Sequence, residues 1–218
     1  AMRKASAKTW KIILAKPSAM VASILIALFL VITSLDCIHF KNSNSVLDNM
    51  MSPLNQTLEA TYSEPLATTL AVAQSKLVNG KVTRVYEQLK YTAAHASGHT
   101  ILQQVIIGGA AGIIVGLLIC ALISYCLAKN KKTSFKAAML AIYRKQTALA
   151  LRAACITLFI ISILSGIISA LAQHYHVLGT DQIGNDVLYQ SIKSIRTGVL
   201  IGALTTGIML PFALILGP

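Results

Sequence analysis

One stretch near the C-terminus of this 218-residue chain combines turn-forming and capping residues. Gly179 and Gly184 are of the residue type that most readily adopts positive φ. The polar residues between and after them have side chains that bond nearby backbone groups in turns and at helix starts: Thr180, Asp181, Asn185 and Asp186. The spacing predicts a tight turn followed by a helix that has Asp186 or Asn185 as its N-cap.

The pattern changes to helical periodicity directly after this turn. One predicted face carries Val187, Leu188, Ser191, Ile192 and Ile195, whereas Gln190, Lys193 and Arg196 fall off it. We therefore expect an amphipathic helix that lies along the outer membrane surface and leads into the last apolar run.

Five histidines are the other residues that could do chemistry: His39, His95, His99, His174 and His176. His95 and His99 have i, i+4 spacing, and imidazole suits zinc, copper and nickel, so an external metal site is one interpretation. No cysteine or carboxylate joins them at ligand spacing. We favour packing, capping or solvent exposure, and we assign no metal site.

Catalytic motifs are absent from the sequence. It has no P-loop, no G-x-S-x-G, no H-E-x-x-H and no ionisable residue inside an apolar run that would mark a proton or ion relay. We therefore expect no catalytic residues and no cofactor, and we do not expect an enzyme.

The composition indicates an integral membrane protein. Hydrophobic residues make up 55% of the chain and charged residues 12%, whereas soluble domains average about 25% charged residues. Four apolar runs are long enough to cross a bilayer: 17–36, 105–127, 153–172 and 197–218. The predicted fold class is all-α, a polytopic transmembrane helical protein with four spans and a mixed periplasmic segment.

The net charge of +12 lies on one side of the predicted membrane. Residues 1–16 and 128–152 carry basic residues and no acid, whereas all seven acids fall in 36–104 and 173–196. The positive-inside rule places the first two segments, and with them both termini, in the cytoplasm. Because topology explains the charge and the chain has one tryptophan, we expect no nucleic-acid partner.

The segments between the spans have distinct patterns. Residues 1–16 predict a cytoplasmic amphipathic arm that anchors the first span, in preference to a signal peptide, since no A-x-A site follows the run. Residues 37–104 predict a mixed external cap with a hairpin turn at Asn79-Gly80. Residues 128–152 predict a basic amphipathic helix, with Phe135, Met139, Ile142 and Tyr143 at helical spacing, against the inner leaflet; docking to a cytoplasmic protein is the alternative.

Two spans carry small residues at four-residue spacing. These are Gly108, Gly112 and Gly116 in the second span and Gly198 and Gly202 in the fourth. Such stripes let another helix approach backbone to backbone. Packing within the chain is favoured for both, and a subunit interface is the alternative.

The stretch Gly179–Leu188 resembles the G-T-D-x-x-G-R-D-V/L signature of the dipeptide/oligopeptide/nickel family of ABC-transporter permeases, with Asn185 where the family has arginine. Residues 60–67, Ala-Thr-Tyr-Ser-Glu-Pro-Leu-Ala, and the three preceding spans also look like a long-chain subgroup of that family. The resemblance implies a periplasmic gate motif formed by Gly179, Thr180, Asp181, Gly184, Asn185 and Asp186.

The resemblance also implies a cellular role and partners. The chain would be the N-terminal portion of a permease subunit in the bacterial inner membrane, in an importer for peptides or related small solutes. It would pair with a second permease subunit, ATP-binding subunits that drive transport, and a periplasmic solute-binding protein, within the lipid bilayer. The alternative is a non-transporting scaffold or accessory subunit built on a truncated permease module.

Overall fold

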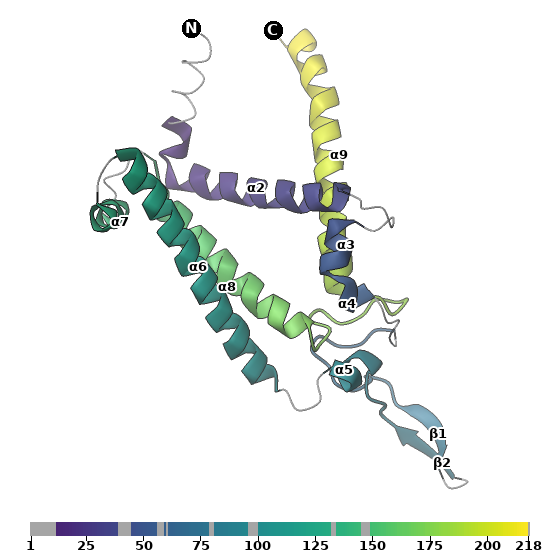
Figure 1. Ribbon diagram of the computed structural model, residues 1–218. Coiled ribbons are helices and arrows are strands. Elements are labelled where there is room, and N and C mark those ends of the chain that lie inside the picture. Colours follow the sequence, from purple (N-terminus) through teal and green to yellow (C-terminus); the bar gives the residue numbers. More distant parts are fainter. Residues whose placement is uncertain are drawn as a thin grey trace. The chain divides into compact units, whose positions relative to one another are not determined.

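The computed structural model describes residues 12–38, 45–55, 59, 61–78, 81–95, 100–131, 134–144 and 149–217 (Figure 1). Most of these residues are helical. Four helices are long and apolar enough to cross a membrane: α2 (Pro17–Cys37), α6 (Ile101–Lys131), α8 (Leu151–Ala172) and α9 (Val187–Leu216). The protein is thus an all-α polytopic membrane protein, as the sequence predicts.

Short elements connect these helices. They are α3 (Val46–Met50), α4 (Ser52–Asn55), β1 (Gln74–Val78), β2 (Lys81–Val85), α5 (Lys90–His95) and α7 (Phe135–Tyr143). The strands pair antiparallel, with Gln74 opposite Val85 and Val78 opposite Lys81. This register confirms the predicted hairpin, although its turn residues lie outside the described part of the chain. The predicted N-terminal arm lies largely outside it too.

The chain forms two compact units. The first contains residues 1–27 and 101–170, and the second contains residues 28–100 and 171–218. Every acidic residue of the sequence belongs to the second unit: Asp36, Asp48, Glu59, Glu64, Glu87, Asp181 and Asp186. The first unit is therefore purely basic, and the division of the fold coincides with the division of charge along the sequence.

Helices α6 and α8 pack backbone to backbone in the first unit. A Cβ added to Gly108 would lie 2.5 Å from the carbonyl oxygen of Gly166, and one added to Gly112 would lie 2.6 Å from that of Ser162. At Gly116 the added Cβ would lie 2.6 Å from Cδ2 of Phe159. The predicted packing role of the α6 glycines within the chain is confirmed. In lipid, such close contact substitutes for the hydrophobic drive that operates in water.

Helix α9 runs without a break from Asp186, its N-cap, to Leu216. The prediction of a separate surface helix before the last span is therefore wrong, because nothing between Ile195 and Gly198 stops the helix. Within the described residues, a Cβ added to Gly198 or Gly202 would meet no atom within 4 Å. The favoured packing of this stripe is thus not seen within the second unit.

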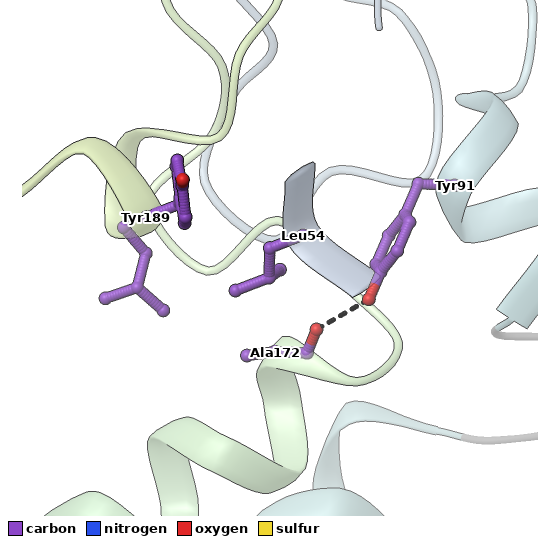
Figure 2. Close-up of a cluster of buried hydrophobic side chains, with 5 residues drawn as sticks. Leu54, Tyr91, Ala172 and Tyr189 are labelled. Carbon is purple, nitrogen blue, oxygen red and sulfur yellow. Dashed lines mark hydrogen bonds between the residues drawn. The ribbon is translucent and has the colours of Figure 1, made fainter. Parts of the chain in front are cut away.

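A small core organises the second unit (Figure 2). It contains Leu54 of α4, Tyr91 of α5, Ala172 at the end of α8, and Leu188 and Tyr189 at the start of α9. The Tyr91 hydroxyl donates to the carbonyl oxygen of Ala172 at 2.8 Å. Burying a large apolar side chain contributes about 1.5–3 kcal/mol, so this core fixes the start of α9 on the segment between α2 and α6.

Candidate functional site

The segment that enters α9, residues 177–186, is termed the motif loop. Its two glycines have positive φ, 75° at Gly179 and 91° at Gly184. A Cβ on Gly179 would lie 2.2 Å from the Ser63 carbonyl oxygen, and one on Gly184 would lie 2.1 Å from the Glu59 carbonyl oxygen. Both backbone angle and space therefore require glycine, and the predicted turn is confirmed.

Hydrogen bonds attach the motif loop to a segment more than a hundred residues earlier. The amide of Glu59 donates to Gly184 O at 3.1 Å, and the amide of Tyr62 donates to Asp181 O at 3.2 Å. The amide of Ser63 donates to Thr180 Oγ1 at 2.9 Å, across a separation of 117 residues. We call the described residues 59 and 61–66 the companion segment, because hydrogen bonds join them to the loop.

Asp181 holds the loop in its turn. Its Oδ1 accepts from the amides of Ile183 at 2.8 Å and Asn185 at 2.9 Å. Hydrogen bonds from the backbone, that of Asn185 first, lower the pKa of the Asp181 carboxyl. Asn185 adds a longer side-chain contact, 3.5 Å from its Nδ2 to Asp181 Oδ2. In this chain, therefore, Asn185 supports the turn from within.

Asp186 has two roles. Its Oδ1 accepts from the amide of Tyr189 at 2.9 Å, which caps α9 as predicted, and its Oδ2 lies 2.6 Å from Nδ1 of His176. Both residues are buried, with 2% and 1% of their surfaces exposed. The His176 Nε2 has no hydrogen-bond partner among the described residues. The pair is placed to hold the loop on the helix.

Tyr91 packs against this pair. Its ring centroid lies 4.8 Å from that of His176. Burial, and then the negative charge of Asp186, raise the pKa of Tyr91 to about 12. Glu59 of the companion segment fixes the same helix, since its carboxylate accepts from the amides of Lys90, at 3.1 Å, and Tyr91 at the start of α5. Glu59 therefore joins the motif loop to α5.

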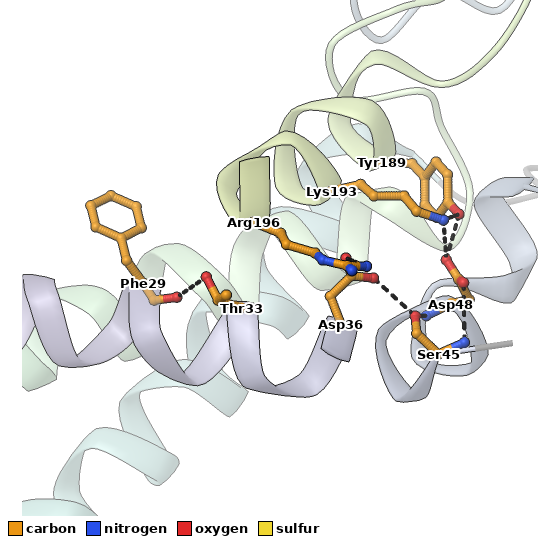
Figure 3. Close-up of polar contacts among 8 residues, drawn as sticks. All are labelled: Phe29, Thr33, Asp36, Ser45, Asp48, Tyr189, Lys193 and Arg196. Carbon is orange, nitrogen blue, oxygen red and sulfur yellow. Dashed lines mark hydrogen bonds and ion pairs between the residues drawn. The ribbon is translucent and has the colours of Figure 1, made fainter. Parts of the chain in front are cut away.

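A polar cluster holds the start of α9 on α3 (Figure 3). The Asp48 Oδ1 accepts from the Tyr189 hydroxyl at 2.6 Å and from Lys193 Nζ at 2.9 Å. The Tyr189 hydrogen bond, and after it that of Lys193, hold the pKa of Asp48 well below its ordinary value of 3.8. Asp48 also forms a capping box with Ser45, which starts α3.

A second ion pair joins α9 to the end of α2. Arg196 Nη1 lies 3.4 Å from Oδ2 of Asp36, and the Ser45 hydroxyl donates to the other carboxylate oxygen of Asp36 at 3.0 Å. Figure 3 shows these side chains converging on one side of α9. Asp36 is 2% exposed, so these two partners replace the water that a surface carboxylate would bind.

The predicted gate residues thus divide into two groups. Gly179, Thr180, Gly184 and Asp186 are buried and shape the loop, whereas Asp181 and Asn185 are partly exposed. Ile183 at the tip has 64% of its surface exposed and Gln182 beside it is exposed. The tip of the motif loop is therefore exposed.

The groups of the site that could do chemistry are enclosed or dispersed among the described residues. The His176–Asp186 pair could orient a base, but the imidazole is enclosed and Nε2 is not open to a substrate. In the described residues, no three His, Cys, Asp or Glu side chains lie close enough together to hold a metal ion. His39, His99 and the side chain of His95 lie outside what the structure describes.

The roles of several site residues were not predicted from the sequence. These residues are Glu59, Ser63, Tyr91 and His176 around the loop and Asp36, Asp48, Tyr189 and Lys193 around the start of α9. The sequence did contain a signal: it has only seven acidic residues beside its long apolar helices, so each carboxylate was a candidate for a structural contact. Four of the site's carboxylates, Asp36, Asp48, Glu59 and Asp186, bond to groups that the fold must fix.

Comparison with known proteins gives no relative: no protein-family model, no curated protein and no solved structure matches this chain.

Proposed function

We propose that the chain acts as a membrane-spanning permease subunit of an ABC importer for peptides or related small solutes, in the bacterial inner membrane. One observation carries the proposal. The two stretches with permease-like patterns, residues 60–67 and 179–188, meet through the hydrogen bonds between the companion segment and the motif loop. Their pairing makes the two resemblances one structural feature.

The surface of α9 supports the need for a membrane partner. The helix is apolar and long enough to span a bilayer, and it is exposed along its membrane part. Within the second unit, no described atom lies within 4 Å of a Cβ added to Gly198 or Gly202, whereas the glycines of α6 touch the backbone of α8 in the first unit. A second permease subunit would supply the helix that packs on α9.

The tip of the motif loop supports an external contact. Gln182 and Ile183 are exposed on a loop whose backbone is fixed at both ends by buried bonds. A loop held in this way loses little conformational entropy on binding, which favours recognition. In the proposed arrangement the tip faces the partner permease or a solute-binding protein on the periplasmic side, and separate ATP-binding subunits supply the energy.

Site-specific photocrosslinking in the native cell tests the proposal. A photoreactive residue at Gly202 reports the partner of α9, one at Ile183 reports the partner of the loop tip, and one at Leu118, an exposed position on α6, is the control. We expect the Gly202 adduct to contain a second polytopic membrane protein, and we expect ATP-binding subunits to co-purify. The Leu118 variant should give no such adduct.

The opposite result would favour the scaffold interpretation. If Gly202 and Ile183 crosslink only to proteins unrelated to transport, and no ATP-binding subunit is recovered, the chain is an accessory membrane protein and the permease proposal is wrong. Uptake of labelled peptides in a strain that lacks the protein gives an independent readout of transport.

A further inference from the structure

A cavity of about 340 Å³ lies in the first unit, where the start of α2 and the start of α8 meet. Six of its lining residues are alanine, proline, leucine or isoleucine, among them Pro17, Leu149 and Ile156. The seventh is Arg152. The cavity is therefore apolar with a single cationic group, which is the pattern that an anionic amphiphile matches.

The cavity lies at the level where two spans begin. Pro17 is the first residue of α2 and Leu151 is the first residue of α8. The Ala150 amide donates to the Leu14 carbonyl oxygen at 3.2 Å, and this hydrogen bond joins the residues that precede α8 to those that precede α2. Because both helices cross the hydrocarbon core, their common end lies among lipid headgroups, and this holds for either orientation in the membrane.

Arg152 has no carboxylate available in its own unit, because residues 1–27 and 101–170 contain no aspartate or glutamate. Its guanidinium lies 5.4 Å from the centroid of the Tyr143 ring in α7. This contact positions the cation without neutralising it. No carboxylate of the first unit can balance this charge, and at this depth lipid phosphodiester groups are the abundant anions.

We propose that this cavity binds an anionic phospholipid, with the headgroup phosphate on the Arg152 guanidinium and the glycerol and acyl part against Pro17, Leu149 and Ile156. Arginine suits this role because its planar fork can donate two hydrogen bonds to one phosphate. Basic pockets at the ends of membrane spans take anionic lipids for the same reasons. The inference is independent of the transport proposal.

The test uses the full chain, purified in a mild detergent and depleted of lipid. Native mass spectrometry measures bound phosphatidylglycerol against phosphatidylcholine with the same acyl chains, and thermal unfolding is followed with each lipid and with inorganic phosphate. We expect selective retention of phosphatidylglycerol and a rise in the unfolding temperature with that lipid alone. Inorganic phosphate shares the anionic group but lacks the apolar part, so it should stabilise little.

Matched variants locate the site. Arg152→Gln should lower phosphatidylglycerol binding about fivefold, the factor that one basic group near an anionic surface provides, whereas Arg152→Lys should retain most of it. Lys129→Gln removes the same charge from an exposed position of α6 in the same unit and should bind like the parent. Ala153→Trp should exclude lipid by filling the cavity while it keeps Arg152.

Three results would overturn the proposal. They are equal binding of phosphatidylglycerol and phosphatidylcholine, a Lys129→Gln loss as large as that of Arg152→Gln, or an effect of inorganic phosphate equal to that of the lipid. The second would show only the general attraction of a basic surface, and the third would show that the apolar lining has no part in binding. If Ala153→Trp does not fold, the arginine and lysine variants still decide between these outcomes.

Discussion

Nδ1 of His176 lies 2.6 Å from Oδ2 of Asp186, and the other oxygen of the same carboxylate caps α9 through the amide of Tyr189. One buried carboxylate thus joins the two ends of the motif loop, where His176 precedes the loop and α9 follows it. The loop shape and the start of the helix are therefore coupled. A change at Asp186 should disturb both.

Replacing Asp186 tests this coupling. Loss of an N-cap costs about 1 kcal/mol and loss of a hydrogen bond to a charged group about 1.5–3 kcal/mol, so Asp186→Ala should destabilise the protein by about 2–4 kcal/mol. Asp186→Asn keeps a capping oxygen and should cost less. Chemical unfolding in detergent, followed by circular dichroism, measures the difference.

Gln190→Ala is the matched control for the Asp186 variants, since Gln190 is exposed one turn into the same helix. It should change the free energy of unfolding by less than about 0.5 kcal/mol. A loss of stability in Asp186→Ala no larger than in Gln190→Ala would show that the carboxylate does not couple loop and helix.

The glycines of the motif loop should not tolerate a side chain. In Gly184→Ala the new Cβ would meet the Glu59 carbonyl oxygen at 2.1 Å in a backbone with φ of 91°, so the companion segment must separate from the loop. Backbone strain of this kind costs about 1–3 kcal/mol before the steric clash is added. We expect strongly reduced folded yield and rapid proteolysis of the segment between α2 and α6.

Gly202→Ala provides the contrast. Its added Cβ meets no described atom within 4 Å, and alanine favours a helix over glycine by about 0.5–1 kcal/mol. The isolated chain should therefore be as stable as the parent or slightly more stable in the same proteolysis assay. Equal behaviour of Gly184→Ala and Gly202→Ala would contradict the close contact at Glu59.

The hydrogen bonds that Asp48 accepts predict that the stability of the protein depends on pH. The folded state holds the pKa of Asp48 well below its ordinary value of 3.8, so the unfolded chain takes up the proton first as the pH falls. The stabilisation is thus complete above the ordinary value and is lost as the pH drops from about 5 towards 3 and below. In Asp48→Asn the fall in the free energy of unfolding over this range should be shallower.

The pKa of Asp181 is also lowered in the folded state, so the acid dependence should be reduced in Asp48→Asn without vanishing. The free energy of unfolding should depend less on pH in the double variant Asp48→Asn/Asp181→Asn than in either single variant. Measuring the free energy of unfolding at several pH values gives the slopes. A slope in Asp48→Asn equal to that of the parent would mean that Tyr189 and Lys193 do not favour the ionised carboxyl.

The structural elements that depend on the local residue pattern could be predicted from the sequence. Long apolar runs gave the four spans, Asn79-Gly80 gave the hairpin, and the residue types at 179–186 gave the turn and the Asp186 cap. These features depend on backbone propensity and on hydrophobic length, which neighbouring residues decide. Charge along the sequence also matched the division into two units.

Contacts between distant residues were not predictable in the same way. Nothing in the local pattern pairs Thr180 with Ser63 or Tyr189 with Asp48, because a hydrogen bond across more than a hundred residues depends on the tertiary fold. The continuous α9 was missed for a related reason. From the sequence, Lys193 and Arg196 indicated a helix on the membrane surface, separate from the last span. In the structure they pair with Asp48 and Asp36, so one unbroken helix can carry both charges.

Two glycines of α6 that lie one helical turn apart provide a further prediction. At Gly112 an added Cβ would lie 2.6 Å from the Ser162 carbonyl oxygen of α8, whereas at Gly109 it would make ordinary contact, 3.9 Å from Cγ1 of Ile167. Gly112→Ala must therefore push the helices apart, and Gly109→Ala need not. Because this close contact stabilises the association of α6 with α8, Gly112→Ala should lower the free energy of unfolding by about 1–3 kcal/mol.

The rate of cysteine labelling at Cys155, which is partly buried beside Cys120 across the α6–α8 contact, reports this separation. A membrane-permeant maleimide should label Cys155 faster in Gly112→Ala than in the parent, on a background in which Cys37, Cys120 and Cys126 are serine. Gly109→Ala, in the same background, should label at the parental rate. If both glycine variants label alike, the backbone contact at Gly112 does not hold the two helices together, and the force between them lies in the side chains around it.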